Sequence, residues 1–309
     1  MIKKIIVARH HGFCMGVKRA INIAEETARE HTDRVTILKE IVHNEAVVER
    51  FRNEGVGQAF SVDDVSEGTL IISAHGIAPA VIQQAESRGL SVVDATCPLV
   101  ERIYDIIEKV VANGYYVVHY GDPHHDETDG VLGHAPDRIT VVPNKETLDS
   151  LPDWKDRKLG FTIQTTADME QANEMKLLVK QKWPHIEIFD TICNATNQRQ
   201  SAIMELAPHV DLILVVGSQT SANSKRLQKI SEAITGRAYL INSEQDIEKE
   251  WFTGGKPVEK VGLTAGASTP QFLVEAVIDR LVEMSGGTAA VEHQERRKRR
   301  RREKPQDVA

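Results

Sequence analysis

The stretch "SVVDATCPLVERI" at residues 91–103 and the stretch "EIFDTICNATNQRQ" at residues 187–200 share one layout. Each contains a short β-rich run, an aspartate, two further residues, a cysteine and then the start of a helical pattern. The cysteine is Cys97 in the first stretch and Cys193 in the second. A layout that recurs along a chain indicates related structural units rather than one continuous core.

The third cysteine has a related setting near the N-terminus. "HHGFCMGVKRA", residues 10–20, places Cys14 between Gly12 and Gly16 at the mouth of a predicted helix. An arginine follows each cysteine five or six residues later: Arg19, Arg102 and Arg199. A polar loop then recurs at a similar distance after each cysteine, around His43, His125 and Asn223. We therefore expect three related units, each contributing one thiol and one polar loop.

Short β-rich runs alternate with helical patterns along the body of the chain. Leu70–Ala74 and Leu212–Val216 are typical of the strands, and Leu99–Ala112 and Gln271–Met284 are typical of the helices. This alternation predicts the α/β class with small parallel sheets. Ligands of such sheets bind at the carboxyl ends of strands, beside helix N-termini. The expected architecture is three α/β lobes in a pseudo-threefold arrangement around a central site.

The repeat places the lobes at residues 1–96, 97–192 and 193–290. Residues 291–309 form a basic tail with eight Lys/Arg and four Asp/Glu, although the whole chain carries a net charge of -7. The tail has little apolar surface to bury, so we expect it to be disordered. It is suited either to contact with nucleic acid or an acidic partner, or to a purely solubilising role.

The gross composition limits the class of protein. A chain of 309 residues exceeds what one core usually supports. No apolar run approaches the roughly 18 residues of a membrane span, and the N-terminus lacks the features of a signal peptide. Three cysteines are too few for a disulfide framework, which points to a reducing, cytoplasmic setting.

Three thiols brought to one centre suggest a metal site. A cysteine at a helix N-terminus favours the thiolate form, and three thiolates suit a soft metal while leaving one coordination position open. A zinc ion with water as fourth ligand is an alternative, although the CxxC pairs typical of zinc sites are absent from the sequence. A second alternative is that the cysteines are small buried hydrophobic residues.

The polar loops suggest an anion site. Histidines follow predicted strands, and hydroxyl or amide side chains stand where loops enter helices. These residues are His43, His75, His124, His125, Ser221, Asn223, Ser268 and Thr269. Together with helix N-termini they suit an anion such as diphosphate. Neither a Walker A motif nor a glycine-rich dinucleotide fingerprint is present, so a nucleotide cofactor is not supported.

The motifs as a set resemble the LytB/IspH family of 4-hydroxy-3-methylbut-2-enyl diphosphate reductases. They run in order from about residue 5 to 285: "GFCMGVKRAI", "VHN", "SAHG", "DATCPLV", "QTT", "DTICNATNQRQ", "GSQTSANSKRL" and "TAGAS". The resemblance implies a three-lobed α/β fold around a 4Fe–4S cluster. It also implies the last step of the methylerythritol phosphate route. In that step, reductive removal of an allylic hydroxyl yields isopentenyl and dimethylallyl diphosphates.

The resemblance also assigns roles to individual residues. The cluster ligands would be Cys14, Cys97 and Cys193, and the open iron would act on the substrate's alcohol as Lewis acid and electron donor. The diphosphate would be bound by His43, His75, His125, Ser221, Asn223 and Ser268. Glu127, in "HDETDG", would deliver the proton, and Thr165, in "QTT", would position the alcohol. Reduced ferredoxin or flavodoxin is the electron donor that the resemblance implies.

Two substitutions depart from the family's motifs. Asp126 stands where the family usually has proline, and Ala222 replaces a serine. If this segment is extended, Asp126 and Glu127 point to opposite faces, so only one of them can face the cluster. The departures leave open a paralogue that reduces a different allylic diphosphate. A cluster-bearing sensor or nucleic-acid-binding protein and a zinc hydrolase acting on a phosphorylated substrate are competing hypotheses from different functional classes.

Overall fold

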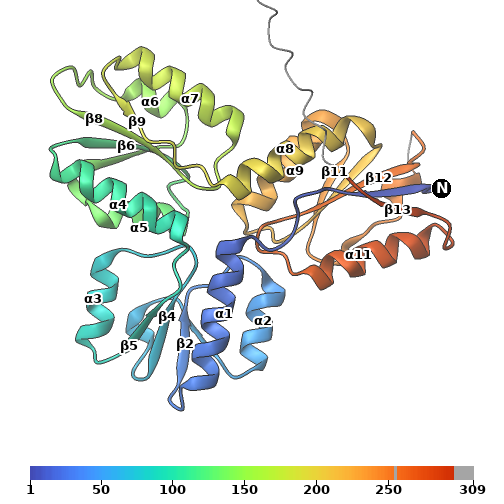
Figure 1. Cartoon of the computed structure of the whole chain (residues 1–309), viewed down its shortest axis with the longest axis horizontal. Coiled ribbons are helices and arrows are strands. Elements are labelled where there is room, and N and C mark those ends of the chain that lie inside the picture. The colour runs from blue at the N-terminus through green and yellow to red at the C-terminus, as the bar shows by residue number, and fades with distance from the viewer. Residues whose placement is uncertain (254–255, 296–309) are drawn as a thin grey trace, which may run out of the picture.

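The computed structural model describes residues 1–253 and 256–295. In these ranges the chain forms three lobes, each with one sheet and its flanking helices (Figure 1). All the strand pairs found there are parallel, and central strands such as β10 (Leu212–Val216) are buried along their whole length. Strands that are covered on both faces explain these short apolar runs. The predicted fold class of three small parallel sheets is confirmed.

The first lobe has the strand order β3-β2-β4-β5. Its elements are α1 (Met15–Glu30), β2 (Val35–Leu38), α2 (Glu45–Asn53), β3 (Gly57–Ala59), η1 (Val62–Asp64), β4 (Thr69–Ile72), α3 (Pro79–Ser87) and β5 (Ser91–Asp94). Ala20, Ile21 and Ala24 lie on one face of α1, as their helical spacing predicts. This face packs against Ile37 and Ile71 of the sheet, so α1 belongs to the first lobe.

The second lobe has the strand order β7-β6-β8-β9. Its elements are α4 (Pro98–Ala112), β6 (Tyr116–Tyr120), α5 (Asp126–His134), η2 (Pro136–Arg138), β7 (Ile139–Val142), α6 (Lys145–Ser150), β8 (Leu159–Ile163), α7 (Met169–Lys182) and β9 (Glu187–Ile188). Ile103 and Ile107 of α4 are fully buried beside Val117 of β6. Apolar residues four apart on α4 therefore attach this helix to its own sheet.

The third lobe has the strand order β11-β10-β12-β1-β13. Its elements are β1 (Lys4–Val7), α8 (Asn194–Leu206), η3 (Ala207–His209), β10, α9 (Ala222–Thr235), β11 (Ala238–Ile241), η4 (Glu244–Asp246), α10 (Glu250–Thr253), β12 (Lys260–Ala265), α11 (Gln271–Met284) and β13 (Ala290–His293). Ile203 and Leu206 of α8 pack beside Ile213 of β10. No helix in the described ranges is long and apolar enough to cross a bilayer.

The first strand of the chain lies outside the lobe in which the boundary 1–96 placed it. β1 pairs with β12 and β13, and Figure 1 shows its blue arrow among the orange strands of the third lobe. β1 pairs with β12 in the third sheet. The equivalent pairs are β5 with β4 in the first sheet and β9 with β8 in the second. The beginning of the chain thus completes the sheet of the last repeat, and the lobes close into a ring. The boundaries near residues 96 and 192 remain predictions.

The expected disordered tail does not begin at residue 291. β13 pairs in parallel with β1, and Gln294 N donates to Val7 O at 2.8 Å. The Gln294 side chain also donates to Ala202 O at 3.0 Å. The strand itself is exposed, so backbone hydrogen bonds at a sheet edge hold it without apolar side chains. The remainder of the basic tail, residues 296–309, lies outside the described residues.

Candidate active site

The three cysteines occupy equivalent backbone positions. Cys14, Cys97 and Cys193 are the N-cap residues of α1, α4 and α8. The backbone N–H of each donates to a carbonyl oxygen at 3.0 Å. The acceptors lie two residues past the ends of β4, β8 and β12: Ala74 for Cys97, Thr165 for Cys193 and Ala267 for Cys14. The repeat in the sequence is therefore a repeat in geometry.

Each cysteine also lies where the chain passes from one lobe to the next. Cys97 joins β5 of the first lobe to α4 of the second, and Cys193 joins β9 of the second to α8 of the third. Cys14 joins β1 of the third-lobe sheet to α1 of the first lobe. The starts of α1, α4 and α8 converge where the three lobes meet (Figure 1). The three cysteines accordingly line one cavity.

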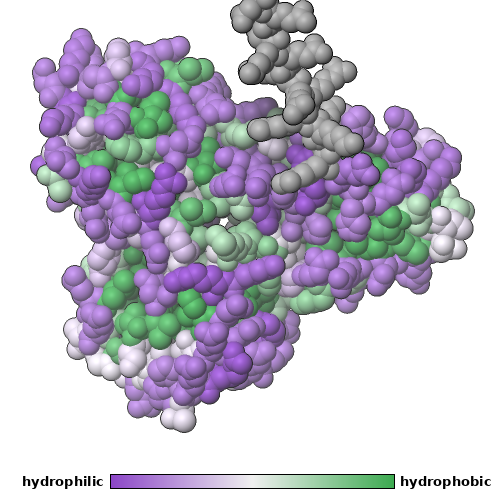
Figure 2. Space-filling model, viewed as in Figure 1, coloured by the Kyte–Doolittle hydropathy of each residue, from purple (hydrophilic) through white to green (hydrophobic). Residues whose placement is uncertain are grey.

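One cavity brings together every residue that the family resemblance assigns to the site, whereas His124 and Thr269, which the polar-loop pattern also selected, do not line it. In the space-filling view, the grooves between the lobes meet near the middle of the molecule (Figure 2). The predicted residues that line the cavity are Cys14, Cys97, Cys193, His43, His75, His125, Glu127, Thr165, Ser221, Asn223 and Ser268. The cavity is therefore the candidate active site, while the roles of these residues remain predictions.

The environment of the thiols suits a bound group. All three cysteines are free of disulfides. Burial raises the pKa of the Cys97 and Cys193 thiols, and backbone N–H groups of the helices that they begin act in the opposite direction. Gly16 leaves room for the sulfur of Cys97, because a Cβ on Gly16 would lie 2.4 Å from Cys97 Sγ.

The thiols are spread too widely for a single tetrahedral ion. Sulfur ligands of one Zn²⁺ lie about 3.8 Å from each other, given Zn–S bonds of about 2.3 Å. In the part of the chain that the structure describes, one set of three potential ligand atoms lies mutually within 4.8 Å, and it consists of His43, His75 and Asp126. The cysteines surround a wider space, which fits an iron–sulfur cluster better than a zinc ion.

Three histidines form the wall beside the thiols. The rings of His43 and His75 stack with centroids 4.0 Å apart, and the His125 ring meets them edge-on at 5.6 and 5.8 Å. Burial lowers the pKa of His125 to about 4 and that of His75 well below its ordinary value, with the neighbouring His43 acting in the same direction. His75 and His125 are therefore neutral near pH 7, and each offers one N–H donor.

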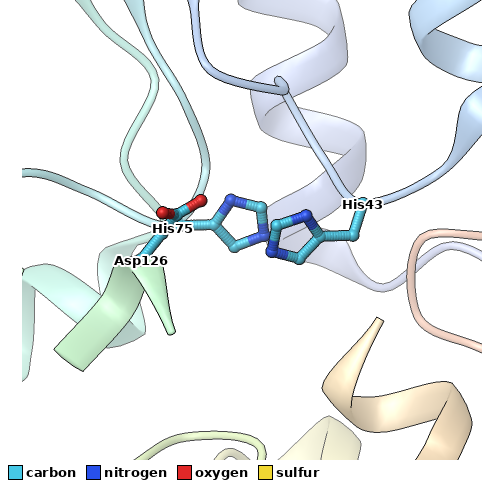
Figure 3. Close-up of side chains that lie close together, drawn as sticks. All are labelled: His43, His75 and Asp126. Atoms are coloured by element: carbon cyan, nitrogen blue, oxygen red, sulfur yellow. The ribbon is translucent and has the colours of Figure 1, made fainter. Parts of the chain in front are cut away.

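Charged residues that the sequence analysis did not select surround this wall. Glu40 Oε2 lies 2.9 Å from His43 Nδ1, and Lys39 forms an ion pair with Asp126. Figure 3 shows the stacked rings of His43 and His75, with Asp126 entering from the start of α5. Two imidazoles and a carboxylate are suitable ligands for a divalent cation, whereas Lys39 and the histidines suit an anion. The only sequence signal for Lys39 and Glu40 was their position just before His43.

Glu127 and Thr165 form a tightly bonded pair inside the cavity. Thr165 donates to the carboxylate twice, from its backbone N–H and from its hydroxyl, both at 2.6 Å. Glu127 is 2% exposed, and this burial raises its pKa to about 7 against the opposing effect of the Thr165 bonds. A substantial fraction of Glu127 therefore carries a proton near neutral pH, as a general acid requires.

The expected extended segment around Glu127 is wrong. His125 is the N-cap of α5, and both Asp126 and Glu127 lie in the first helical turn. Consecutive helical residues differ by about 100° in direction, so the two carboxylates still separate. Asp126 turns toward Lys39, and Glu127 turns into the cavity.

The third lobe contributes the remaining polar groups. Ser221 is the N-cap of α9 and accepts from Ser224 N at 3.3 Å. Ser268 donates its hydroxyl to His43 O at 2.8 Å, which joins the third lobe to the first. Asn223 is 4% exposed, and both polar atoms of its amide lack a hydrogen-bond partner among the described residues. A buried unpartnered amide at a cavity wall indicates a ligand that satisfies it.

The fold and the site define a class: three-lobed α/β proteins with a central cavity that combines three cysteine thiols, a wall of histidines and a buried acid. A model of the family described as "LytB protein" matches residues 5–282. This chain belongs to the LytB family.

Relatives and solved structures agree with this membership. A 4-hydroxy-3-methylbut-2-enyl diphosphate reductase of Tolumonas auensis is 39% identical, with 92% of each chain covered. One of Aquifex aeolicus is 37% identical and covers 92% of this chain and 97% of its own. The structure of the E-1-hydroxy-2-methyl-but-2-enyl-4-diphosphate reductase of Plasmodium falciparum superposes with a TM-score of 0.91 at 30% identity, covering 96% of this chain and 94% of that one.

Proposed function

We propose that this chain reduces (E)-4-hydroxy-3-methylbut-2-enyl diphosphate to isopentenyl diphosphate and dimethylallyl diphosphate, the last step of the methylerythritol phosphate route. The observation that carries the proposal is one cavity in which thiols from three lobe junctions meet Glu127, a buried acid that is partly protonated at neutral pH. Removing a hydroxyl as water needs electrons and protons together. A redox group and a proton donor in one enclosed space meet that need.

The cofactor in this proposal is one 4Fe–4S cluster held by Cys14, Cys97 and Cys193. The wide spacing of the thiols and the space left by Gly16 support it. When bound, the cluster would supply electrons and a Lewis-acidic iron that has no protein ligand. The chain itself supplies thiolates at three helix N-termini, where backbone N–H groups stabilise negative charge.

The diphosphate would bind at the histidine wall. Neutral His75 and His125 each offer an N–H, and Lys39 places a positive charge beside them. The amide of Asn223 would gain the partner that it lacks. The full set that we assign to the substrate is His43, His75, His125, Thr165, Ser221, Asn223 and Ser268.

Glu127 would protonate the departing hydroxyl. Its carboxyl stays oriented because Thr165 holds both oxygens. The Thr165 hydroxyl donates its hydrogen to the acid, and its oxygen can also accept a hydrogen bond from the substrate's alcohol. The proton would thus be held beside the bond that breaks.

Reduced ferredoxin or flavodoxin is the electron donor that we propose, because the reaction consumes electrons that the chain does not store. The alternative of a sensor or nucleic-acid-binding protein is not favoured, since it gives no use to a buried acid held beside the thiols. A paralogue acting on another allylic diphosphate rests on Ala222, which lines the same cavity.

The test begins with protein purified without oxygen. Iron and acid-labile sulfide should approach four of each per chain, and the protein should reduce the allylic diphosphate when given a low-potential donor. Pyrophosphate should compete with substrate, and His43→Ala should raise KM more than it lowers iron content. A colourless protein containing zinc, or a brown protein without turnover of this substrate, would overturn the proposal.

A further inference from the structure

One of the three arginines that follow the cysteines differs from the others. Arg19 and Arg102 are exposed, and Arg19 donates to Thr96 O at 2.8 Å. Arg199 is 5% exposed and lies in the middle of the α8 sequence. The sequence pattern is the same for all three, so the difference in burial indicates a separate role for Arg199.

The contacts of Arg199 place its guanidinium between two cysteines. Nη1 donates to Ala195 O at 2.9 Å, and Nη2 donates to Gly12 O. Ala195 lies two residues after Cys193, and Gly12 lies two residues before Cys14. The guanidinium therefore bridges the segments that carry two of the three thiols, and these segments lie far apart in the chain.

No carboxylate of the described residues forms an ion pair with this buried charge. Among the described residues, the hydrogen bonds of Arg199 go to two neutral carbonyl groups, and its buried Nε has no partner. Burial lowers the pKa of Arg199, while the sulfurs of Cys14 and Cys193 raise it. An arginine remains charged in proteins, and a buried unpaired cation is costly. The compensating negative charge must therefore come from the cysteine sulfurs or from a group that they bind.

We propose that Arg199 is the counter-charge of the anionic group held by the three cysteines and raises the reduction potential of that group. This inference rests on the proposed function. An electron taken from the donor adds negative charge without making or breaking a bond. A fixed cation in a low-dielectric setting stabilises the reduced state more than the oxidised state. Arg199 would thereby ease electron uptake without touching the substrate.

The experiment compares Arg199→Met and Arg199→Lys with wild type in the full-length, cluster-loaded protein. Arg102→Met is the matched control, because Arg102 follows Cys97 at nearly the same offset but is exposed. Midpoint potentials are measured by anaerobic redox titration, followed by visible absorption and electron paramagnetic resonance. We expect Arg199→Met to reduce the equilibrium constant for one-electron uptake at least tenfold, which corresponds to about 59 mV. Arg199→Lys should recover most of this shift, and Arg102→Met should show none.

The remaining outcomes also decide the question. A destabilised Arg199→Met protein with an unchanged potential would assign Arg199 to packing and overturn the inference. Loss of the cluster from Arg199→Met but not from Arg199→Lys would support the charge role, whereas loss from both would contradict it. If wild type holds a cluster and turns over substrate while no variant moves the potential, this inference fails and the proposed function stands. If the wild-type protein holds no cluster, both this inference and the proposed function are wrong.

Discussion

At the scale of single residues, burial decides the chemistry of the two adjacent carboxylates. Glu127 is buried against Thr165, and its pKa is raised to about 7. Asp126 is half-buried and faces the ammonium group of Lys39. Neighbours in the chain thus have different surroundings: a buried position bonded to Thr165 for Glu127, and a cation for Asp126. This contrast supports the proposal that Glu127 is the proton donor, with Asp126 as the ion-pair partner of Lys39.

Substituting the two carboxylates should separate these roles. We expect Glu127→Gln to bind substrate but lose about 10²–10⁴-fold in turnover, because the amide cannot donate a carboxylic proton. This loss corresponds to about 3–5 kcal/mol of barrier. Asp126→Asn should stay within about tenfold of wild type, since Asp126 lies outside the proton path. Steady-state kinetics with iron content checked measures both. An inactive Asp126→Asn beside an active Glu127→Gln would show that the acid is misassigned.

The raised pKa of Glu127 predicts a pH profile. Turnover should fall above about pH 7, approaching tenfold per pH unit, as the carboxyl loses its proton. The pKa of Glu127 is about 7 in the folded state and 4.5 in the ordinary carboxyl, so protonation stabilises the folded state, fully so below pH 4.5. This contribution is lost as pH rises through 7. The free energy of unfolding of wild type should therefore decline relative to that of Glu127→Gln between pH 4.5 and about 7. Parallel curves for the two proteins would contradict the raised pKa.

At the scale of elements, the helix N-termini shape the thiol site. α1, α4 and α8 each have a cysteine as N-cap, so backbone N–H groups of the first turn of each helix lie near a sulfur. Close approach of the helices requires a small residue at one point. Gly16, in the first turn of α1, faces Cys97 Sγ of the next lobe junction. The start of α1 thus limits the space around the Cys97 sulfur, which belongs to another lobe junction.

Gly16→Ala should separate helix stability from cluster binding. Alanine favours a helix over glycine by about 1 kcal/mol, so α1 itself should be stabilised. The new methyl group would collide with Cys97 Sγ, and iron content should fall severely. Met15→Ala, at an 80% exposed position in the same turn, is the control and should keep its iron. Iron analysis and circular dichroism measure the two effects; full iron in Gly16→Ala would contradict the close approach.

The edge strand β13 predicts where the chain can be shortened. Deleting residues 290–309 removes one of the two strands that pair with β1, and we expect a loss of about 1–3 kcal/mol from a few backbone hydrogen bonds. Deleting residues 296–309 keeps β13 and should leave the free energy of unfolding unchanged. Denaturant unfolding of the two truncated proteins gives the comparison. Equal stabilities would mean that β13 contributes nothing to the sheet.

At the scale of the whole molecule, the lobes depend on one another through the site. Each thiol comes from a crossing between two lobes, and Ser268 of the third lobe bonds to His43 of the first. The first strand completes the last sheet, which closes the ring. No lobe by itself contains the cavity, so function requires all three.

Because the three crossings are equivalent, substitution of any of the three cysteines should have the same effect on iron content and activity. Cys14→Ser, Cys97→Ser and Cys193→Ser should each lose most of their iron and their activity, because each thiol occupies the same backbone position. Iron and sulfide analysis after anaerobic purification measures this. A variant with full iron content would remove that cysteine from the ligand set.

Local patterns were sufficient for much of the fold and for the candidate residues. The alternation of strands and helices, the repeat around Cys97 and Cys193, and the loops that carry His43 and His125 are visible without coordinates. They are visible because the 2.0 and 3.6 residue periods and the polar strand ends are properties of neighbours in the chain. The position of Thr165 beside Glu127 came only with the family resemblance, since these residues come from segments that are far apart in the chain.

The sequence by itself determined the class of fold, the three thiols and the polar loops that follow them. Only the tertiary structure decided that β1 and β13 join the third sheet, that Glu127 is buried, and that Arg199 is enclosed while Arg19 and Arg102 are not. These features depend on contacts between segments far apart in the chain. Burial and electrostatic environment are set by whatever packs against a residue, and a local pattern contains no information about that neighbour.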